Sequence, residues 1–251
     1  MGVELLSPEG LRVDGRRAGE LRRLACELGG AGGGAGAGTP DGAATMVMGN
    51  TRAEAAVWGP REPEGGRAGP GLGTARVELS FLPFAGSERR RRGRGDRRTG
   101  ELTSVLAQVV ESVVMLELLA RSEVCVCVSV VQDDGGALPA AINAAVLALA
   151  EAGVPMRALA SACAAGTLDG EPALDLNRTE EAAAGRGLVA TVSRHDSRVL
   201  ALHSEEECSV DALGDLLRSA SSGCEAVSAF MRKELEARVA RQAQCLGMAS
   251  G

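Results

Sequence analysis

The stretch that decides the fold runs from Val124 to Met156, VCVCVSVVQDDGGALPAAINAAVLALAEAGVPM. Residues 124–131 are apolar on both faces, which predicts a strand in a central, covered position of a sheet. Residues 140–152 are apolar nearly all round, so we expect a buried helix there. The carboxylate-glycine turn between them, 132–136, aims backbone N–H groups at one point, which suits an oxyanion.

The residues after this turn do not complete an anion site. The backbone amides of Gly135 and Gly136 are the candidate phosphate ligands. Ala137 and Leu138 follow them and offer neither a cation nor a hydroxyl, and Pro139 lacks an N–H group. The sequence therefore predicts the frame of a phosphate site without strong ligands.

Composition limits the class of protein. At 251 residues the chain can bury a sizeable core, in one domain or two joined halves. It has no apolar run near the roughly 20 residues of a membrane span and no signal-peptide pattern at its start, so we expect an intracellular, soluble protein without membrane contact. The seven cysteines form no Cys-x-x-Cys pair and neither histidine lies near two of them, which predicts reduced cysteines and no metal site.

Positive charge is concentrated in one loop. Between Gly86 and Arg98 there are seven arginines against two acidic residues, although the whole chain has a net charge of −6. Such a patch favours contact with a polyanion. Arg97 and Arg98 would begin a helix, where the macrodipole disfavours cations unless an anion lies nearby. For Arg92, Arg94 and their neighbours a flexible, solvated loop explains the charge equally well.

The order of predicted elements indicates an α+β fold with two related halves, 1–153 and 154–251. The glycine-alanine tract at 29–38 is expected to be a flexible insertion in the first half. The expected strands are 21–28, 43–48, 54–58, 75–83, 124–131, 158–168, 188–193 and 199–203, and the expected helices are 101–119, 140–152 and 210–246.

Two carboxylates, Asp175 and Glu181, lie six positions apart and are candidates for acid catalysis or for binding a divalent metal. Acidic loops are more often solvated surface, so this signal alone is weak.

A series of short motifs covers nearly the whole chain, and in this order it resembles the RNase PH family. It is most similar to the exosome core-ring subunit that carries the active site in archaea. The resemblance implies a single compact chain with the RNase PH-like fold, related to the second domain of ribosomal protein S5. The motifs are RVDGR (12–16), GNT (49–51), GP (59–60), GDRR (95–98), DGG (134–136), NAA (143–145), AGVPM (152–156) and DLN (175–177).

The resemblance also implies phosphorolysis, in which inorganic phosphate attacks the terminal 3′ linkage of RNA. Arg97 and Arg98 match the family's arginine pair, which holds RNA and phosphate, and Asp175 matches the first of its two aspartates. Glu181 replaces the second aspartate, and Ala137-Leu138 replaces a Thr/Ser-Arg pair of the phosphate loop. Without that arginine the loop lacks a charge-assisted hydrogen bond of roughly 1.5–3 kcal/mol, so a catalytically silent site is expected.

We therefore expect a non-catalytic, RNA-contacting subunit of a hexameric exosome ring, active in ribosomal RNA maturation and messenger RNA turnover. Its expected partners are other RNase PH-like subunits, RNA-binding cap subunits, a hydrolytic nuclease and single-stranded RNA, in the nucleus, nucleolus and cytoplasm. No cofactor is expected. One alternative is an active phosphate-dependent 3′-to-5′ exoribonuclease, which would use inorganic phosphate as co-substrate and possible Mg²⁺. Another is a regulatory binding protein that uses the same fold.

Overall fold

The strands predicted at 43–48 and 54–58 and the apolar strand predicted at 124–131 lie in one five-stranded sheet of order β1-β2-β3-β5-β4. The structure is a computed structural model that describes residues 6–7, 9–29, 38–63, 72–89, 96–184, 187–193, 196–204 and 209–245. β2 and β3 pair antiparallel up to Met48 and Thr51, so they form a hairpin around Gly49-Asn50. The strands are β1 (Leu24–Leu28), β2 (Gly42–Met48), β3 (Thr51–Arg61), β4 (Thr74–Phe81) and β5 (Glu123–Gln132).

A parallel crossover joins β4 to β5 through α1 (Arg97–Val113). The helix buries the apolar stripe that the sequence predicts, including Leu102, Leu106 and Val109. It ends at Val113 rather than at 119, because Val114 is extended and forms a β-bridge with Met156. A short 3-10 helix, η1 (Leu116–Leu119), follows.

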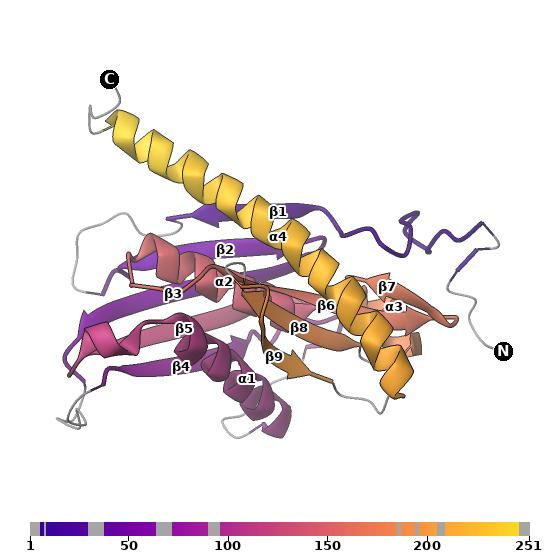
Figure 1. Cartoon of the computed structure of the whole chain (residues 1–251), viewed down its shortest axis with the longest axis horizontal. Helices are drawn as coiled ribbons and strands as arrows, with labels where there is room; N and C mark the ends of the chain where they lie inside the picture. The colour runs from indigo at the N-terminus through magenta and orange to yellow at the C-terminus, as the bar shows by residue number, and fades with distance from the viewer. Residues whose placement is uncertain are drawn as a thin grey trace.

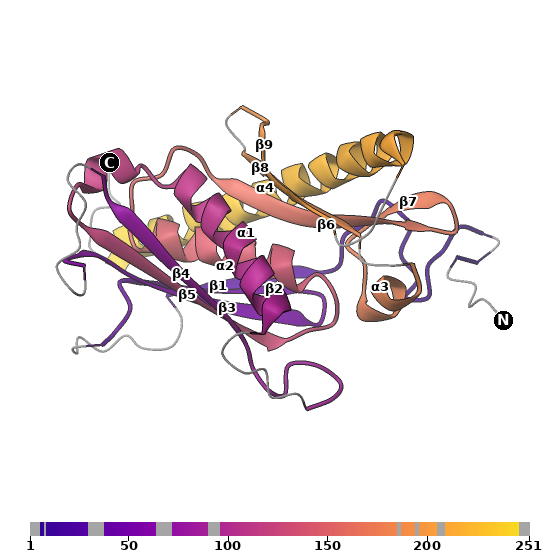
Figure 2. The same cartoon turned by 90° about the horizontal axis from the view of Figure 1, so that it is seen from below.

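The central helix is α2 (Ala137–Glu151), in which twelve residues are buried. It begins three residues before the predicted start at Ala140. Pro139 is the third residue of the helix, where a missing N–H removes no intrahelical hydrogen bond. α2 packs against strands of both sheets, so it lies between them (Figure 2).

The second sheet has the order β7-β6-β8-β9, with every pair antiparallel. Asn143 of α2 bridges to this sheet: its Nδ2 donates to the Ala162 carbonyl at 2.9 Å, and its Oδ1 accepts from the Ala162 N–H at 2.8 Å. β8 and β9 confirm the strands predicted at 188–193 and 199–203, whereas β7 and α3 were not predicted. The elements are β6 (Ala160–Leu168), β7 (Glu171–Leu174), α3 (Arg178–Ala184), β8 (Leu188–Ser193) and β9 (Val199–His203).

A long helix, α4 (Val210–Cys245), covers the other face of the second sheet and runs diagonally across the molecule in Figure 1. Alternation along β6 separates the two packing layers. Ala162 belongs to the core around α2, whereas Cys163 packs in a second core with Ala220 and Cys224 of α4. The layers are therefore the first sheet, α1 and α2, the second sheet, and α4. This is the mixed α+β architecture that the sequence predicts.

The outer face of the first sheet differs from the prediction for β5. Cys127 and Ser129 on that face are only half-buried, and a cavity of about 270 Å³ opens beside them. The strand is internal to the sheet, as predicted, but within this chain it is fully covered only on the side of α2. The six described cysteines are all free. Among the described helices, none is long and apolar enough to cross a membrane.

Candidate functional site

The turn between β5 and α2 has the shape that the sequence predicts for an anion site. Gly135 and Gly136 both have left-handed backbones, with φ of 86° and 65°. A Cβ atom on Gly135 would lie 2.7 Å from the backbone nitrogen of Arg178. Only glycine combines this φ with so close an approach, so the shape of the turn depends on it.

Carboxylates of the same chain accept hydrogen bonds from the backbone N–H groups of this turn. The Gly136 N–H donates a hydrogen bond of 2.7 Å to Oε1 of Glu181, and the Gly135 N–H donates one of 3.3 Å to Oδ1 of Asp133. Glu181 thus brings from α3 the negative charge that a helix N-terminus attracts. Both N–H groups already have acceptors in this conformation, so a phosphate would have to displace Glu181 and Asp133. Phosphate binding by Gly135 and Gly136 stays a prediction.

Groups around the Glu181 carboxyl shift its pKa in opposite directions. Burial raises its pKa above the ordinary value, and the negative charge of Asp133 adds to this rise. The hydrogen bond from Gly136 and the positive charges of Arg22 and Arg98 oppose it. The net shift is upward, so the ionised carboxylate is held at an energetic cost to the folded state.

Asp175 lies in the interior, in an ion pair with Arg22. Nη2 of Arg22 lies 2.7 Å from Oδ1, while its Nε and its backbone N–H donate to Oδ2 at 3.0 and 2.9 Å. The side chain of Asp175 is 1% exposed. Both carboxylate oxygens are bound to Arg22 in this conformation, which favours a structural role for Asp175. Its catalytic role stays a prediction.

Arg22 also fixes the glycine turn. Its Nη1 donates to the Asp134 carbonyl at 2.9 Å and its Nη2 to the Gly135 carbonyl at 3.0 Å. The Thr51 hydroxyl donates to the same Gly135 carbonyl at 2.6 Å and accepts from the Asp134 N–H at 3.1 Å. The buried guanidinium therefore ties the turn to Asp175, and the polar atoms of this inner layer satisfy one another.

A second buried pair positions α3. Nε of Arg12 donates to Glu180 at 2.7 Å, and Nη1 of Arg12 donates to the Leu174 carbonyl at 2.6 Å. Glu180 also accepts from the Asn177 N–H at 2.8 Å, while Asn177 Oδ1 accepts from the Glu180 N–H at 2.9 Å. This reciprocal capping fixes the first turn of α3. Glu181, the next residue, is thereby directed to the N-terminus of α2.

The two predicted arginines differ in their surroundings. The side chain of Arg97 is 92% exposed and its Nε donates to Glu101 at 2.9 Å, whereas Arg98 lines the cavities beside the turn. Asp96 caps α1, because its carboxylate accepts from the Thr99 N–H at 3.3 Å and from the Thr99 hydroxyl at 2.7 Å. These two carboxylates offset the unfavourable position of the cations, so no external anion is required there.

The larger cavity next to Arg98 has a volume of about 290 Å³. The described residues that line it bring two guanidinium groups, of Arg98 and Arg178, and three carboxylates, of Glu88, Asp133 and Glu181. A smaller cavity of about 50 Å³ adjoins it and shares the side chains of Arg98, Asp133 and Glu181. Carboxylates thus outnumber cations in the described lining, which disfavours the entry of a free phosphate ion.

Arg92 and Arg94 lie outside the described residues, so their predicted contact with RNA stays a prediction. In the part of the chain that the structure describes, no three His, Cys, Asp or Glu side chains come together to hold a metal ion. Asp175 and Glu181 do not form such a group either, because they contact Arg22 and Gly136 respectively.

Comparison with known proteins extends this picture. Residues 20–155 match the 3′ exoribonuclease family, domain 1, known as RNase PH. The chain is 38% identical over 236 residues to the exosome complex component RRP41 homolog of Arabidopsis thaliana, covering 93% of this chain and 95% of that protein. It is 36% identical over 248 residues to human exosome complex component RRP41, covering 98% and 99%. This chain belongs to the RNase PH family.

The fold agrees with that assignment. Rice (Oryza sativa) Rrp46 superposes on this RNase PH chain with a TM-score of 0.79 at 26% identity, covering 90% of this chain and 100% of that one. The Archaeoglobus fulgidus exosome with RNA bound to the active site gives a TM-score of 0.73 at 22% identity, covering 87% and 92%. The expected RNase PH-like fold is confirmed.

Several residues of this RNase PH site were not predicted. Arg178 lines the cavity of about 290 Å³, and Arg22 shapes the glycine turn. His203 lines the cavity of about 50 Å³ together with Arg98. Arg22 was part of an expected strand, and Arg178 opens a helix that was not expected. Asp133 lies in the predicted turn at 132–136, but its position in the sequence does not show which way its side chain points.

Proposed function

We propose that this chain is a core-ring subunit of an RNA exosome that contacts RNA and does not itself carry out phosphorolysis. Support for the assembly comes from plant, human and Thermococcus relatives named exosome complex component RRP41, which match almost the whole chain. The proposed partners are RNase PH-like subunits in a hexameric ring, RNA-binding cap subunits and a separate hydrolytic nuclease. The proposed role is 3′-to-5′ RNA processing in the nucleus, nucleolus and cytoplasm.

The observation that carries the non-catalytic part is the contact between Glu181 and Gly136. An orthophosphate ion in this turn would need the Gly136 N–H, which donates to Glu181 at 2.7 Å. Phosphate would have to displace a carboxylate of the same chain and then lie near Asp133. Leu138 stands where active relatives place a cation. The loop therefore lacks a charge-assisted hydrogen bond that would offset the cost of displacing Glu181.

RNA contact is proposed through Arg98 and Arg178. Both guanidinium groups line the same cavity, so two phosphate-binding side chains are available on one surface. An RNA strand binds through contacts along its whole length, so each phosphate group is held near the protein by the others. A free orthophosphate ion has only its own contacts. The same charges can therefore hold a strand while failing to capture orthophosphate.

The test is an assay of the assembled ring without its hydrolytic nuclease, using RNA labelled near the 3′ end. We expect no release of nucleoside diphosphates when inorganic phosphate is added. Asp175→Ala is unsuitable as the diagnostic change, because it removes a buried ion-pair partner and threatens folding. Arg98→Ala, whose side chain lines the cavity, is the better choice.

Phosphate-dependent release of nucleoside diphosphates that disappears in the Arg98→Ala ring would overturn the proposal in favour of an active exoribonuclease. Release that persists in the Arg98→Ala ring would come from another subunit and would leave this chain non-catalytic. Comparison of the two rings at equal assembly, checked by size-exclusion chromatography, separates these outcomes.

A further inference from the structure

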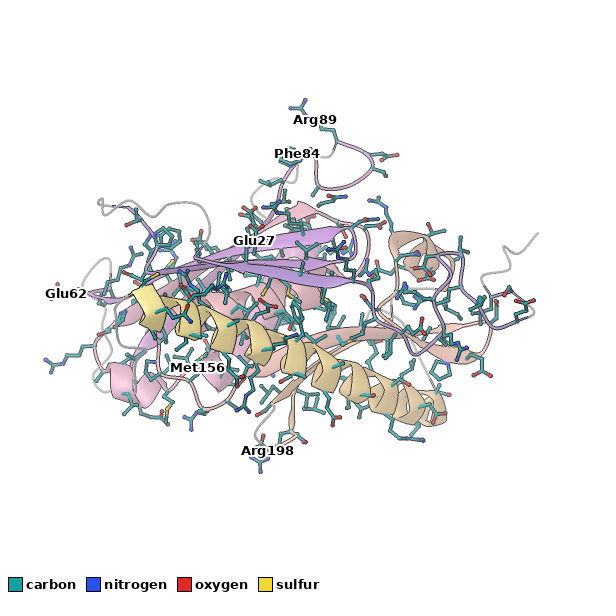
Figure 3. All side chains as sticks on the ribbon, turned by 90° about the horizontal axis from the view of Figure 1, so that it is seen from above. Glu27, Glu62, Phe84, Arg89, Met156 and Arg198 are labelled. Atoms are coloured by element: carbon teal, nitrogen blue, oxygen red, sulfur yellow. The ribbon has the colours of Figure 1, made fainter. Side chains whose placement is uncertain are left out.

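An aromatic side chain is presented to solvent beside the site. Phe84 is 64% exposed, although apolar side chains of this size are usually buried. It lies between β4 and α1, and Figure 3 shows it on a loop that projects beyond the first sheet. A single exposed apolar side chain is common on a protein surface, so the interest of Phe84 lies in its rigid backbone and in the cavity that it borders.

The loop around Phe84 is held firmly. The Ala85 N–H donates to the Leu82 carbonyl at 2.9 Å, which closes a β-turn with Pro83 and Phe84 at its centre. The Leu82 N–H donates to the Val130 carbonyl at 3.0 Å. The Asp133 N–H donates to the Ala85 carbonyl at 2.8 Å, so both ends of the turn are tied to β5 or to the residue that follows it. Phe84 is thus displayed by a fixed backbone.

The ring borders an open surface hollow of about 490 Å³. The polar side chains around this cavity are mostly acceptors or amides. They are those of Asn50, Ser87, Gln132, Asp133, Asp134 and Arg178. The cavity therefore combines one aromatic face with groups that can form hydrogen bonds to the edge of a flat, polar molecule.

Charge decides which part of a nucleotide fits. Asp133 and Asp134 repel a phosphate group, whereas carboxylates accept hydrogen bonds from the amino groups of nucleobases. Arg178 lines this cavity and also the cavity that contains Arg98, so the two spaces adjoin. A strand whose phosphates contact the two arginines can place a base beside Phe84.

We propose that Phe84 is a stacking platform for one base of single-stranded RNA, with the base edge directed to Asp133 and Asp134. This rests on the proposed RNA contact of the ring and adds a base-dependent term to it. Stacking on an aromatic side chain contributes roughly 1–3 kcal/mol per base and tolerates different sequences. Such a platform supplies affinity that does not depend on phosphate charge.

The test compares two ligands of equal length and charge: an adenine oligoribonucleotide and a matched strand without bases. For each assembled ring, the affinity ratio of the two ligands is measured by fluorescence anisotropy. We expect Phe84→Ala to lower this ratio about 5- to 150-fold. Phe84→Trp, which keeps an aromatic face, should retain the ratio, and Phe84→Leu, which keeps only apolar area, should not.

Leu118→Ala is the matched control, because Leu118 is a similarly exposed apolar side chain, 66% accessible, on η1. An unchanged ratio in Phe84→Ala, or an equal fall in Leu118→Ala, would overturn the inference. If the wild-type ring bound neither strand, both this inference and the proposed RNA contact would fail. If the ring released nucleoside diphosphates while Phe84→Ala still lowered the ratio, only the non-catalytic proposal would fail.

Discussion

The Glu181 carboxylate accepts a hydrogen bond of 2.7 Å from the Gly136 N–H, so α3 supplies an anion to the N-terminus of α2. A strand-turn-helix frame of this kind ordinarily presents its amides to an external anion. In this chain the frame is intact, and its glycine N–H groups donate to Asp133 and Glu181 of the same chain. Under the proposed function, this contact is what lets an RNase PH chain keep its architecture without a strong phosphate site.

The raised pKa of Glu181 leads to a prediction about pH. The folded state holds this proton more tightly than the unfolded state, whose pKa is near the ordinary 4.5. The contribution of Glu181 to stability is therefore greatest below the unfolded pKa and falls as pH rises towards the folded pKa. Glu181→Gln removes this pH-dependent decline and keeps an oxygen that can accept from Gly136. We expect the free energy of unfolding of the variant, relative to wild type, to increase between about pH 4 and pH 7.

Denaturant unfolding of both proteins at these two pH values measures the difference. A relative free energy that stays constant, or that decreases with rising pH, would contradict the burial of an ionised carboxylate at this position.

The buried pair of Arg22 and Asp175 makes a second prediction. Removing one partner leaves an uncompensated charge, so Asp175→Ala and Arg22→Ala should each lower the free energy of unfolding by about 3–5 kcal/mol. The double change Arg22→Met with Asp175→Leu should cost less than the sum of the two single changes. Arg218→Ala is the control, because its side chain is 81% exposed and a surface pair contributes about 0–1 kcal/mol. Wild-type stability of Asp175→Ala in urea unfolding would refute a structural role for this carboxylate.

Exposure separates the predicted effects of the two helix-start arginines on RNA binding. Arg98→Ala in the assembled ring should weaken binding of single-stranded RNA. It should also make the slope of log K against log salt shallower by about 0.7 for each RNA phosphate that the variant no longer neutralises. Arg97→Ala should change both less, because Arg97 points to solvent beside Glu101. Affinities measured over a series of salt concentrations test this. A larger effect for Arg97 than for Arg98 would place the RNA outside the cavity.

Periodicity and turn residues were sufficient for most of the fold. The apolar residues of 124–131 and the glycines at 135 and 136 predicted the β5–α2 unit, because these signals are local. β7 was missed since four residues that include Pro172 give little alternation. α3 was missed because its seven residues read as a polar loop.

The site was harder to predict from the sequence than the fold, because its contacts join residues that lie far apart in the chain. Arg12 and Glu180, 168 positions apart, look like solvated surface charges in the sequence and yet both are buried. Asp175 stands in a family motif, which suggests chemistry, whereas its buried ion pair with Arg22 joins positions 153 residues apart and has no signal in the sequence. Glu181 was identified from its spacing to Asp175 and from the resemblance, but its contact with Gly136 depends on where α3 packs.

Titration of inorganic phosphate into the full-length chain, followed by calorimetry, tests the central claim most directly. Wild-type protein is predicted to show no saturable binding at millimolar phosphate, and Glu181→Ala, which frees the Gly136 N–H and removes a negative charge, is predicted to gain it. Saturable one-to-one binding by the wild type that Arg98→Ala abolishes would contradict the account.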